Sequence, residues 1–467
     1  MRIALCTALR NPILLGEGFG ASPVILGKVA PVITGIATHT DEVRRGDLFV
    51  ALAGKHVSGT AFIEKALSLG AAAILAPLGT SLPKGNYWAF LVTNVENALL
   101  RAASMRRNLT DACVIAVSGS VGKTTAKELI AAVLSEAGGV MKSEGNFNST
   151  IGMPISLLGM EEAAYFIIEL GINHKGEMTA MSRALQPNIA VLTNVGSAHI
   201  GHFGSEAELL LEKLSITAGQ RPEDVLLLNE NIDISCLSSS SPRILRLGTS
   251  PTVDFIAQNV VCGKSGVTLD LAFGNRKIEG LSFGIAGTAG REMLSFAAGV
   301  GMLLGVDEAA IRRGIAMASA NLPHRREIIV GKHLVLDDTY NASPEAMIAA
   351  LEAFYYRASD LPRVAVLGDM GELGVYAEAL HERVGEAAAK SGITALFAYG
   401  KYAPSFAAGA LRGGMSKSSI YLFDFGQEKE LCCALSEKLP KNTALLFKAS
   451  RATALDRVLC LFEEDEN

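Results

Sequence analysis

Short apolar runs alternate with amphipathic stretches along the whole chain, and the pattern divides into three series. In the first series, β-type runs and one helix that ends at Gly70 predict a small α/β domain over residues 1–108. The apolar runs lie at 47–52, 73–75 and 88–92, and the helix lies at 61–69. The pattern therefore indicates a first domain that is separate from the rest of the chain.

The second and third series alternate strands with helices, which is typical of crossover units on a mostly parallel sheet. The second series predicts a doubly wound α/β domain over residues 109–322, with strands at 112–117, 166–168, 190–192 and 225–228. The third predicts an independent, Rossmann-like α/β domain over 323–467, with helices near 344–354 and 377–390 and strands at 334–336, 364–367, 395–398, 421–423 and 444–447. The serine run 238–241 predicts a surface loop inside the second domain.

Composition narrows the functional classes. The 467 residues include 42 Lys and Arg and 47 Asp and Glu, a net charge of −5 without long runs of one sign, which argues against nucleic acid or an anionic membrane as partner. With 49% hydrophobic and 19% charged residues the chain is globular.

The apolar runs are too short to span a membrane, and we expect no signal peptide. Seven cysteines without metal-type spacing predict free thiols in a cytoplasmic protein.

The strongest chemical signal lies between an expected strand and a helix that we expect from about Ala126, in the segment Gly119-Ser120-Val121-Gly122-Lys123-Thr124-Thr125. Backbone amides of such a loop cradle phosphates, while Lys123 neutralises the outer phosphates and Thr124 offers a hydroxyl to Mg²⁺. Val117 stands where the strict motif has its first glycine. The lysine, the two threonines and the strand-to-helix context nevertheless favour a site for ATP or GTP over a chance glycine turn.

Three further side chains are candidates for a metal site. Glu169 ends a strand at the carboxyl edge of the sheet, where α/β folds bind ligands, although a solvated surface glutamate would show the same pattern. His199 follows the next strand edge, but a lone histidine is more often structural than a metal ligand. Lys213 lies on a helix expected at 206–216 and by itself indicates only a solvated charge.

These residues, with the segments 144–154 (EGNFNSTIGMP) and 169–177 (ELGINHKGE), resemble the central domain of the Mur ligase family. The segments 337–344 (DDTYNASP), 367–374 (LGDMGELG) and 448–451 (KASR) resemble the branch of that family that joins D-alanyl-D-alanine to UDP-N-acetylmuramoyl-tripeptide. The motifs follow the family's order over nearly the whole chain. The Asn-Pro-Arg motif of the sister enzymes that add a diamino acid does not occur.

The resemblance implies an ATP-dependent ligase of peptidoglycan precursor synthesis, and hence of cell-wall biogenesis, that acts on small molecules in the cytoplasm as a monomer. ATP would phosphorylate the terminal carboxylate of the peptide, and the amine of D-alanyl-D-alanine would displace phosphate from that acyl phosphate. The resemblance makes Lys123, Glu169, His199 and Lys213 catalytic. It also implies Mg²⁺ sites formed by Thr124, Glu169, His199 and a Lys213 carbamylated by CO₂.

The remaining roles also follow from the resemblance. Asn146 and Asn148 would lie near the phosphates, and the first domain would bind the UDP-sugar. From the C-terminal domain, ATP would be reached by Arg325, Asp338 and Asn341, and the incoming dipeptide would be bound by Lys448, Ser450 and Arg451. Arg325 and Arg326 would equally fit a solvated basic pair. We expect the domains to close about a hinge near Leu322-Pro323-His324.

Two segments depart from the family pattern. Gly290 and Met293 stand where the family has asparagines that help to seat adenine, so the adenine contacts must differ. His39 and Asp41 stand where the first domain usually has an aspartate and an arginine. Three alternatives stay open at this point: the diamino-acid-adding sister enzyme, a folylpolyglutamate synthase, and a nucleotide-binding relative without ligase activity. The sequence does not determine whether the third residue of the acceptor peptide is lysine or diaminopimelate.

Overall fold

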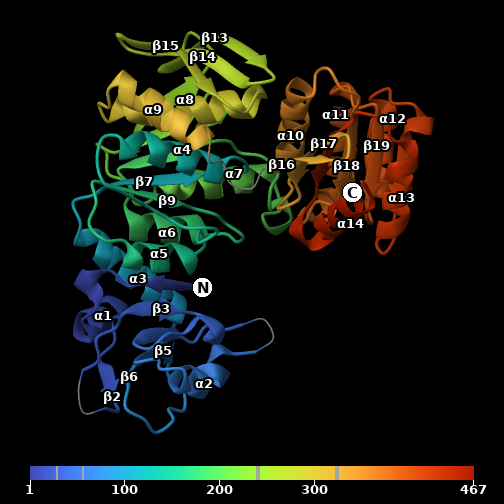
Figure 1. Ribbon diagram of the computed structural model, residues 1–467. Coiled ribbons are helices and arrows are strands. Elements are labelled where there is room, and N and C mark those ends of the chain that lie inside the picture. Colours follow the sequence, from blue (N-terminus) through green and yellow to red (C-terminus); the bar gives the residue numbers. More distant parts are fainter. Residues whose placement is uncertain (28–29, 55–56, 238–241, 321–325, 467) are drawn as a thin grey trace.

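The structure is a computed structural model that describes residues 1–466 except 28–29, 55–56, 238–241 and 321–325. In this part of the chain three sheets follow one another along the sequence, and each has helices packed on it (Figure 1). The predicted α/β class with three domains is confirmed. The expected serine loop at 238–241 and the expected hinge at 322–324 lie outside the described residues.

The N-terminal domain has a six-stranded sheet in the order β1-β3-β4-β5-β6-β2, whose outer strands β1 and β2 run antiparallel to their neighbours. Alternate side chains of β4 pack on opposite faces, with Leu48 and Val50 in one apolar cluster and Phe49 in another. The predicted helix at 61–69 is a 3₁₀ turn followed by the shorter helix α2. The bounds are β1 Arg2–Ala4, β2 Pro23–Ile25, β3 Gly35–Ala37, β4 Asp47–Val50, β5 Ala73–Pro77, β6 Trp88–Val92, α1 Pro12–Phe19, α2 Ile63–Ser68 and α3 Val95–Asn108.

The middle domain has a nine-stranded sheet in the order β15-β14-β13-β12-β11-β10-β7-β9-β8, parallel from β8 to β13. Its central strands confirm the predicted ones, but the antiparallel extension formed by β14 and β15 was not predicted. The strands are β7 Cys113–Ser118, β8 Val140–Lys142, β9 Tyr165–Glu169, β10 Ile189–Leu192, β11 Val225–Asn229, β12 Arg243–Gly248, β13 Phe255–Gly263, β14 Gly266–Phe273 and β15 Arg276–Phe283. The helices are α4 Lys123–Ser135, α5 Gly152–Gly159, α6 Glu177–Leu185, α7 Glu206–Leu214, α8 Gly287–Leu303 and α9 Glu308–Ser319.

The C-terminal domain has a six-stranded sheet in the order β16-β17-β21-β18-β19-β20, parallel except for β16. The strands predicted from apolar runs and the helix predicted at 377–390 are confirmed. The strands are β16 Arg326–Val330, β17 His333–Asp338, β18 Arg363–Gly368, β19 Ala395–Tyr399, β20 Ile420–Phe423 and β21 Ala444–Lys448. The helices are α10 Pro344–Arg357, α11 Ala377–Lys390, α12 Ala403–Arg412, α13 Glu428–Lys438 and α14 Asp456–Glu466.

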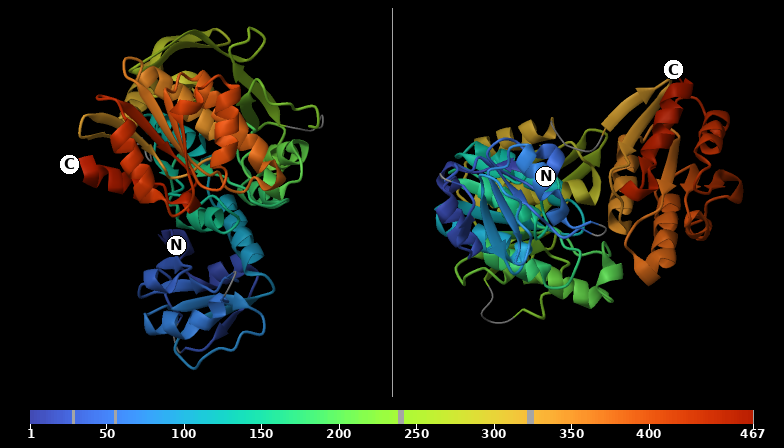
Figure 2. Two further views of the ribbon diagram at one scale, coloured as in Figure 1. Left: turned by 90° about the vertical axis from the view of Figure 1, so that its right-hand side faces the viewer. Right: turned by 90° about the horizontal axis from the view of Figure 1, so that it is seen from below.

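Strand order in the middle sheet determines where the candidate site forms. Because β7 lies between β10 and β9, the loops that follow these three parallel strands meet at one edge of the sheet. The C-terminal domain is a separate lobe beside the middle domain, and its helix α10 faces that domain (Figures 1 and 2). The fold therefore brings the loops of the middle domain opposite the first turn of α10.

Candidate active site

The phosphate-binding loop leads directly into α4, which begins at Lys123, three residues before the predicted start. Gly122 precedes it with φ 83°, a left-handed conformation that favours glycine. Gly119 cannot carry a side chain, because its Cβ atom would be 2.0 Å from Thr193 Oγ1. Lys123 and Thr124 therefore lie in the first helical turn, where backbone amides have no acceptor within the helix and the helix dipole favours an anion.

Asn194, two residues after the end of β10, binds the first part of this loop. Its Oδ1 atom accepts hydrogen bonds from the backbone amides of Ser120 (3.0 Å) and Val121 (2.9 Å). Lys123 Nζ donates to the carbonyl oxygen of Gly119 (2.9 Å), and burial lowers the pKa of this lysine. Asn194 was not predicted as a site residue, although its place at the strand edge beside β7 was the signal available. The amides at the start of α4 remain available for a phosphate.

Glu169 joins the loop to a second segment. Thr124 Oγ1 donates to Glu169 Oε2 (2.7 Å), and Asn148 Nδ2 donates to Glu169 Oε1 (2.7 Å). The Glu169 side chain is only 3% exposed, so its charge lies in a site of low solvent access. The structure thus brings Thr124, Glu169 and Asn148 together, whereas Asn146 lines a cleft between the N-terminal and middle domains. The hydroxyl and carboxylate oxygens are the kind of ligand that Mg²⁺ prefers.

Lys213, near the end of α7, is 2% exposed. Burial, together with the nearby charge of Lys123, lowers the pKa of Lys213 to about 7, while the carboxylate of Glu345 opposes the shift. A buried ammonium group does not fit a metal site. However, a pKa near 7 leaves much of the amine neutral at physiological pH, and a neutral amine reacts with CO₂ to give a carbamate, which offers oxygen ligands.

His199 reaches the C-terminal domain in this structure. Its Nδ1 atom pairs with Glu372, and both residues have left-handed backbones with φ 67° and φ 62°. Within the described residues, no three side chains of His, Cys, Asp or Glu lie together in a way that could hold a metal ion. A metal site that includes His199 therefore depends on other groups, such as the Thr124 hydroxyl or a modified Lys213.

The predicted residues of the C-terminal domain form a second group. Lys448 Nζ donates to Asp338 Oδ2 (2.8 Å) and to the carbonyl oxygen of Asn341 (2.9 Å). Ser450 Oγ is hydrogen bonded to Thr453, and the exposed guanidinium group of Arg451 lies 6.0 Å from the ring centre of Tyr340. The structure brings Lys448, Asp338 and Asn341 together, while Arg325 lies outside the described residues.

Backbone and side-chain contacts connect this lobe to the middle domain. The amide of Gly201 donates to the carbonyl oxygen of Glu372 (3.1 Å), and a Cβ atom on Gly201 would be 2.7 Å from the nitrogen of Gly374. Tyr376 Oη donates to the carbonyl oxygen of Gly204 (2.9 Å), and Ser197 Oγ donates to Glu345 Oε1 (2.9 Å). Glu345 and Glu372 were not predicted as site residues. Glu372 lies within the segment 367–374 that resembles the family, but nothing in the local sequence indicates that Glu345 is a site residue.

The structure shows the surroundings of the residues that depart from the family pattern. Gly290 has no room for a side chain, because its Cβ atom would be 1.8 Å from the carbonyl oxygen of Ile285. Met293 packs its sulfur against Gly122 of the phosphate-binding loop. In the N-terminal domain the exposed side chains of His39 and Asp41 lie 3.5 Å apart, and Lys65 Nζ donates to Asp41 Oδ1 (3.2 Å).

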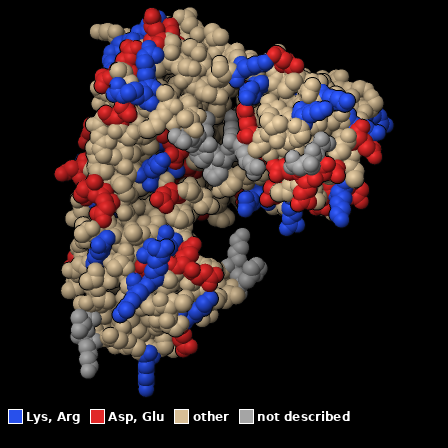
Figure 3. Space-filling view, in the orientation of Figure 1, with Lys and Arg blue, Asp and Glu red and all other residues tan. Residues whose placement is uncertain are grey.

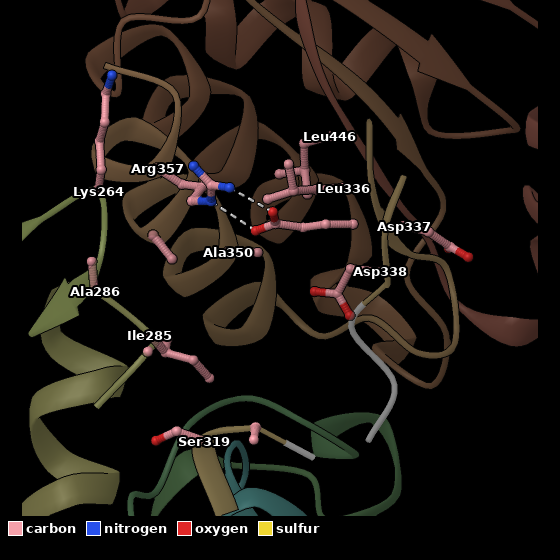
Figure 4. Close-up of a pocket in the computed structure, with 14 residues that line it drawn as sticks. Lys264, Ile285, Ala286, Ser319, Leu336, Asp337, Asp338, Ala350, Arg357 and Leu446 are labelled. Carbon is pink, nitrogen blue, oxygen red and sulfur yellow. Dashed lines mark hydrogen bonds and ion pairs between the residues drawn. The ribbon is translucent and has the colours of Figure 1, made fainter. Parts of the chain in front are cut away.

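Two hollows lie at the domain joints. An open cleft of about 660 Å³ between the N-terminal and middle domains is lined by Met1, Arg2, Asp41, Glu42, Val43, Arg44, Asn146 and Phe147. A pocket of about 290 Å³ lies between the middle and C-terminal domains, with Lys264 and Ile285 on one side and Asp338 on the other (Figure 4). Arg357 and Glu327 pair at the wall of that pocket. Asp338 is the one predicted site residue among its lining residues.

The distribution of charged side chains and the state of the cysteines agree with what the composition predicts. Acidic and basic side chains are interspersed on the face shown in Figure 3. No helix in the described part of the chain is long and apolar enough to cross a membrane. All seven cysteines are free thiols, as predicted.

Comparison with known proteins identifies the class. Three family models match: "Mur ligase family, catalytic domain" over residues 32–102, "Mur ligase middle domain" over 117–292 and "Mur ligase, glutamate ligase domain" over 324–451. The chain belongs to the Mur ligase family.

Individual relatives and solved structures show which members of this family the chain resembles. The UDP-N-acetylmuramoyl-tripeptide–D-alanyl-D-alanine ligase of Bacillus subtilis (strain 168) is 32% identical over 92% of this chain and 93% of its own length. That of Escherichia coli (strain K12) is also 32% identical, over 92% and 94%. A crystal structure of MurF from Acinetobacter baumannii has the same fold, with a TM-score of 0.87, 24% identity and 99% coverage of both chains. The MurF ligase from Thermotoga maritima, solved in complex with ADP, has a TM-score of 0.75 and 26% identity over 92% of this chain and 97% of its own.

Proposed function

We propose that this chain is the ATP-dependent ligase that joins D-alanyl-D-alanine to UDP-N-acetylmuramoyl-tripeptide in peptidoglycan precursor synthesis. The observation that carries the proposal is the network in which Thr124, at the start of α4, donates to Glu169, with the partly buried Lys123 and the buried Lys213 nearby. Its support is that curated relatives at 32% identity, matched over more than nine-tenths of both chains, carry this activity in their names.

In the first step a peptide carboxylate oxygen bonds to the γ-phosphorus of ATP, and the bond from that phosphorus to the ADP oxygen breaks. Lys123 and the free amides of α4 bind the phosphate oxygens and neutralise the charge that develops. In the second step the amine of D-alanyl-D-alanine bonds to the acyl carbon, the bond to phosphate breaks, and the amine loses a proton. In both steps the reacting partners are negatively charged or poorly reactive. The residues therefore act mainly by neutralising charge and by positioning the substrates.

Magnesium fits the oxygen ligands of this site. Thr124 and Glu169 would hold one Mg²⁺, and Glu169, His199 and a carbamylated Lys213 would hold a second. When bound, the cations would offset the repulsion between the peptide carboxylate and ATP. The carbamate forms when the neutral Lys213 amine bonds to CO₂ and releases a proton, which the lowered pKa of Lys213 favours.

We assign the substrates to the three parts of the chain. Residues 1–108 would bind the UDP-sugar, with the cleft lined by Arg2, Arg44 and Asn146 beside it. Residues 109–322 would bind ATP, with contributions from Asp338, Asn341 and Arg325. Residues 323–467 would bind D-alanyl-D-alanine through Lys448, Ser450 and Arg451, since arginine makes paired hydrogen bonds with a carboxylate. We also propose that the enzyme works as a cytoplasmic monomer.

The test is ADP release by the full chain with ATP, Mg²⁺ and UDP-N-acetylmuramoyl-tripeptide, measured with three amine acceptors. We expect release with D-alanyl-D-alanine and background rates with L-lysine or meso-diaminopimelate. Two forms of the tripeptide, with lysine or diaminopimelate in third position, would show which one is the substrate. ADP release that is equal with and without D-alanyl-D-alanine would contradict the proposal.

A further inference from the structure

The C-terminal domain places one carboxylate against the phosphate-binding side of the middle domain. Glu345 is the second residue of α10, the helix that faces the middle domain in Figure 1. Its side chain lies over the backbone of Gly196, since a Cβ atom on that glycine would be 2.4 Å from Glu345 Cδ. Ser197 Oγ donates to Glu345 Oε1 (2.9 Å). The carboxylate therefore rests on the loop that follows β10.

This loop is bound to the phosphate-binding loop. The amide of Gly196 donates to Ser120 Oγ (2.8 Å), and that hydroxyl donates to the carbonyl oxygen of Gly196 (3.2 Å). Glu345 also lies close enough to Lys213 for its charge to favour the protonated amine there. The carboxylate thus lies within electrostatic reach of Lys213 and beside a residue bonded to the phosphate-binding loop, although it belongs to another domain.

One oxygen of this carboxylate has no partner. Glu345 Oε2 is buried and makes no hydrogen bond within the described part of the chain. Ser197 and, at 3.4 Å, Arg383 both contact the other oxygen, Oε1. Burying an ionised oxygen without a donor or a cation costs free energy, so the arrangement indicates that an electropositive partner belongs beside Oε2.

A metal cation suits this position better than a phosphate. A phosphate group would be repelled by the carboxylate. Carbamylation would also turn Lys213 from a cation into an anion, so that in the closed enzyme two negative groups would face each other. A divalent cation bound by both groups offsets that repulsion, and carboxylate oxygen is a ligand that it prefers.

We propose that Glu345 is a ligand of the cation held by Lys213 and His199, so that the second metal site of the middle domain is complete only when the C-terminal domain closes on it. The inference rests on the proposed function. It adds Glu345 to the metal ligands and has a consequence for domain closure. Metal affinity and domain closure become linked, because each stabilises the other. Glu372 acts differently, since it pairs with Nδ1 of His199, so that the other ring nitrogen, Nε2, would be the ligand of the cation.

The test is the binding of Mn²⁺ to the full chain, followed by the electron paramagnetic resonance signal of free Mn²⁺, with a non-hydrolysable ATP analogue present. The variant Glu345→Gln keeps the size of the side chain and removes its charge. We expect the weaker class of Mn²⁺ site to lose affinity about tenfold and Glu345→Asp to recover part of that loss. Circular dichroism and the thermal unfolding midpoint verify that the variants fold.

Glu352→Gln is the matched control. Glu352 lies two turns further along α10 and also contacts the middle domain, where it accepts a hydrogen bond from Thr288 Oγ1 (3.1 Å). We expect this variant to bind Mn²⁺ within about twofold of the wild type. Equal Mn²⁺ affinity in Glu345→Gln and Glu352→Gln would overturn the inference. So would unchanged affinity with a raised KM for D-alanyl-D-alanine, which would assign the carboxylate to the incoming amine. Ligase activity of the wild type is measured separately, so failure here is distinct from failure of the proposed function.

Discussion

The middle domain meets its two neighbours in different ways. At the N-terminal joint, α3 carries Arg106, which is 1% exposed, donates to the carbonyl oxygen of Met160 (2.8 Å) and lies 5.3 Å from the ring centre of Phe166. Ile155 and Leu158 of α5 belong to the apolar core of the N-terminal domain. This joint is therefore packed like a domain interior, and we expect the two domains to move together.

At the C-terminal joint the contacts nearest the site are polar. They include the pair His199–Glu372 and the hydrogen bond from Tyr376 to Gly204, and the pair Lys264–Asp360 lies beyond the far end of α10. Most of these side chains are partly exposed. One apolar cluster continues into the C-terminal domain, but exposed ion pairs contribute only about 0–1 kcal/mol each. The exposed polar contacts nearest the site therefore add little to the free energy that holds this joint closed.

The greatest loss of activity should occur at the reaction centre that the C-terminal joint covers. Lys123→Ala removes a cation from the phosphate-binding loop, and we expect acyl-phosphate formation to fall by at least about a thousandfold. Single-turnover formation of the acyl phosphate measures this step. Lys390→Ala, at an exposed lysine of α11, is the control and should stay near the wild-type rate. Activity of Lys123→Ala within about threefold of wild type would show that this loop is not the catalytic phosphate site.

The next effect concerns Lys213. We expect Lys213→Ala to be nearly inactive and to regain part of its activity in millimolar acetate or formate, which supply the oxygens of the missing carbamate. The rate of ADP release with increasing carboxylate concentration measures the rescue. A fully active variant, or an inactive one that neither anion rescues, would contradict the role of the carbamate.

The two joints should differ in their contribution to stability. Arg106→Ala leaves a cavity and removes a buried hydrogen bond, so we expect a loss of about 2–4 kcal/mol in the free energy of unfolding. Tyr376→Phe removes one exposed hydrogen bond at the other joint and should cost less than about 1 kcal/mol. Urea unfolding of both variants tests the contrast, and equal losses would show that the two joints are packed alike.

The stability of the C-terminal lobe should also depend on pH. Burial lowers the pKa of His381 to about 4, and its Nε2 atom accepts from the amide of Met370 (2.9 Å), in the loop that reaches Glu372. The unfolded chain binds a proton here at an ordinary histidine pKa, so stability is fully present above about pH 6.5 and is lost as pH falls towards 4. We expect up to about 3 kcal/mol of loss in that window, reduced in His381→Gln. Chemical unfolding at pH 7 and pH 4.5 measures it, and a pH dependence that is the same in both proteins would contradict this assignment.

Much of the fold could be predicted because local patterns of apolar and polar residues indicate its strands and helices. Apolar runs marked the parallel strands, and the place of Glu169 at a strand end followed from them. The hairpins β13–β15 were missed although their alternating residues, such as Val267, Leu269 and Leu271, carry the period of two that strands show. That alternation is the local signal from which these strands could have been predicted.

Other features leave no local signal. Glu345 and Ser197 meet only because two domains dock, and they are 148 positions apart in the sequence. Arginine is a residue type that is usually exposed, yet Arg106 is buried because α3 packs against the middle domain. The lowered pKa of Lys213 likewise arises from burial and from charges supplied by other elements, which an amphipathic pattern cannot show.

Small-angle X-ray scattering of the full chain tests whether a movable C-terminal lobe completes the reaction centre of the middle domain. The measurement compares the ligand-free protein with the protein bound to a non-hydrolysable ATP analogue and UDP-N-acetylmuramoyl-tripeptide, with binding verified by calorimetry. We expect a smaller radius of gyration with both ligands, because the substrates bind to both lobes and draw the C-terminal domain closer to the middle domain. An unchanged radius of gyration with both ligands bound would contradict this closure.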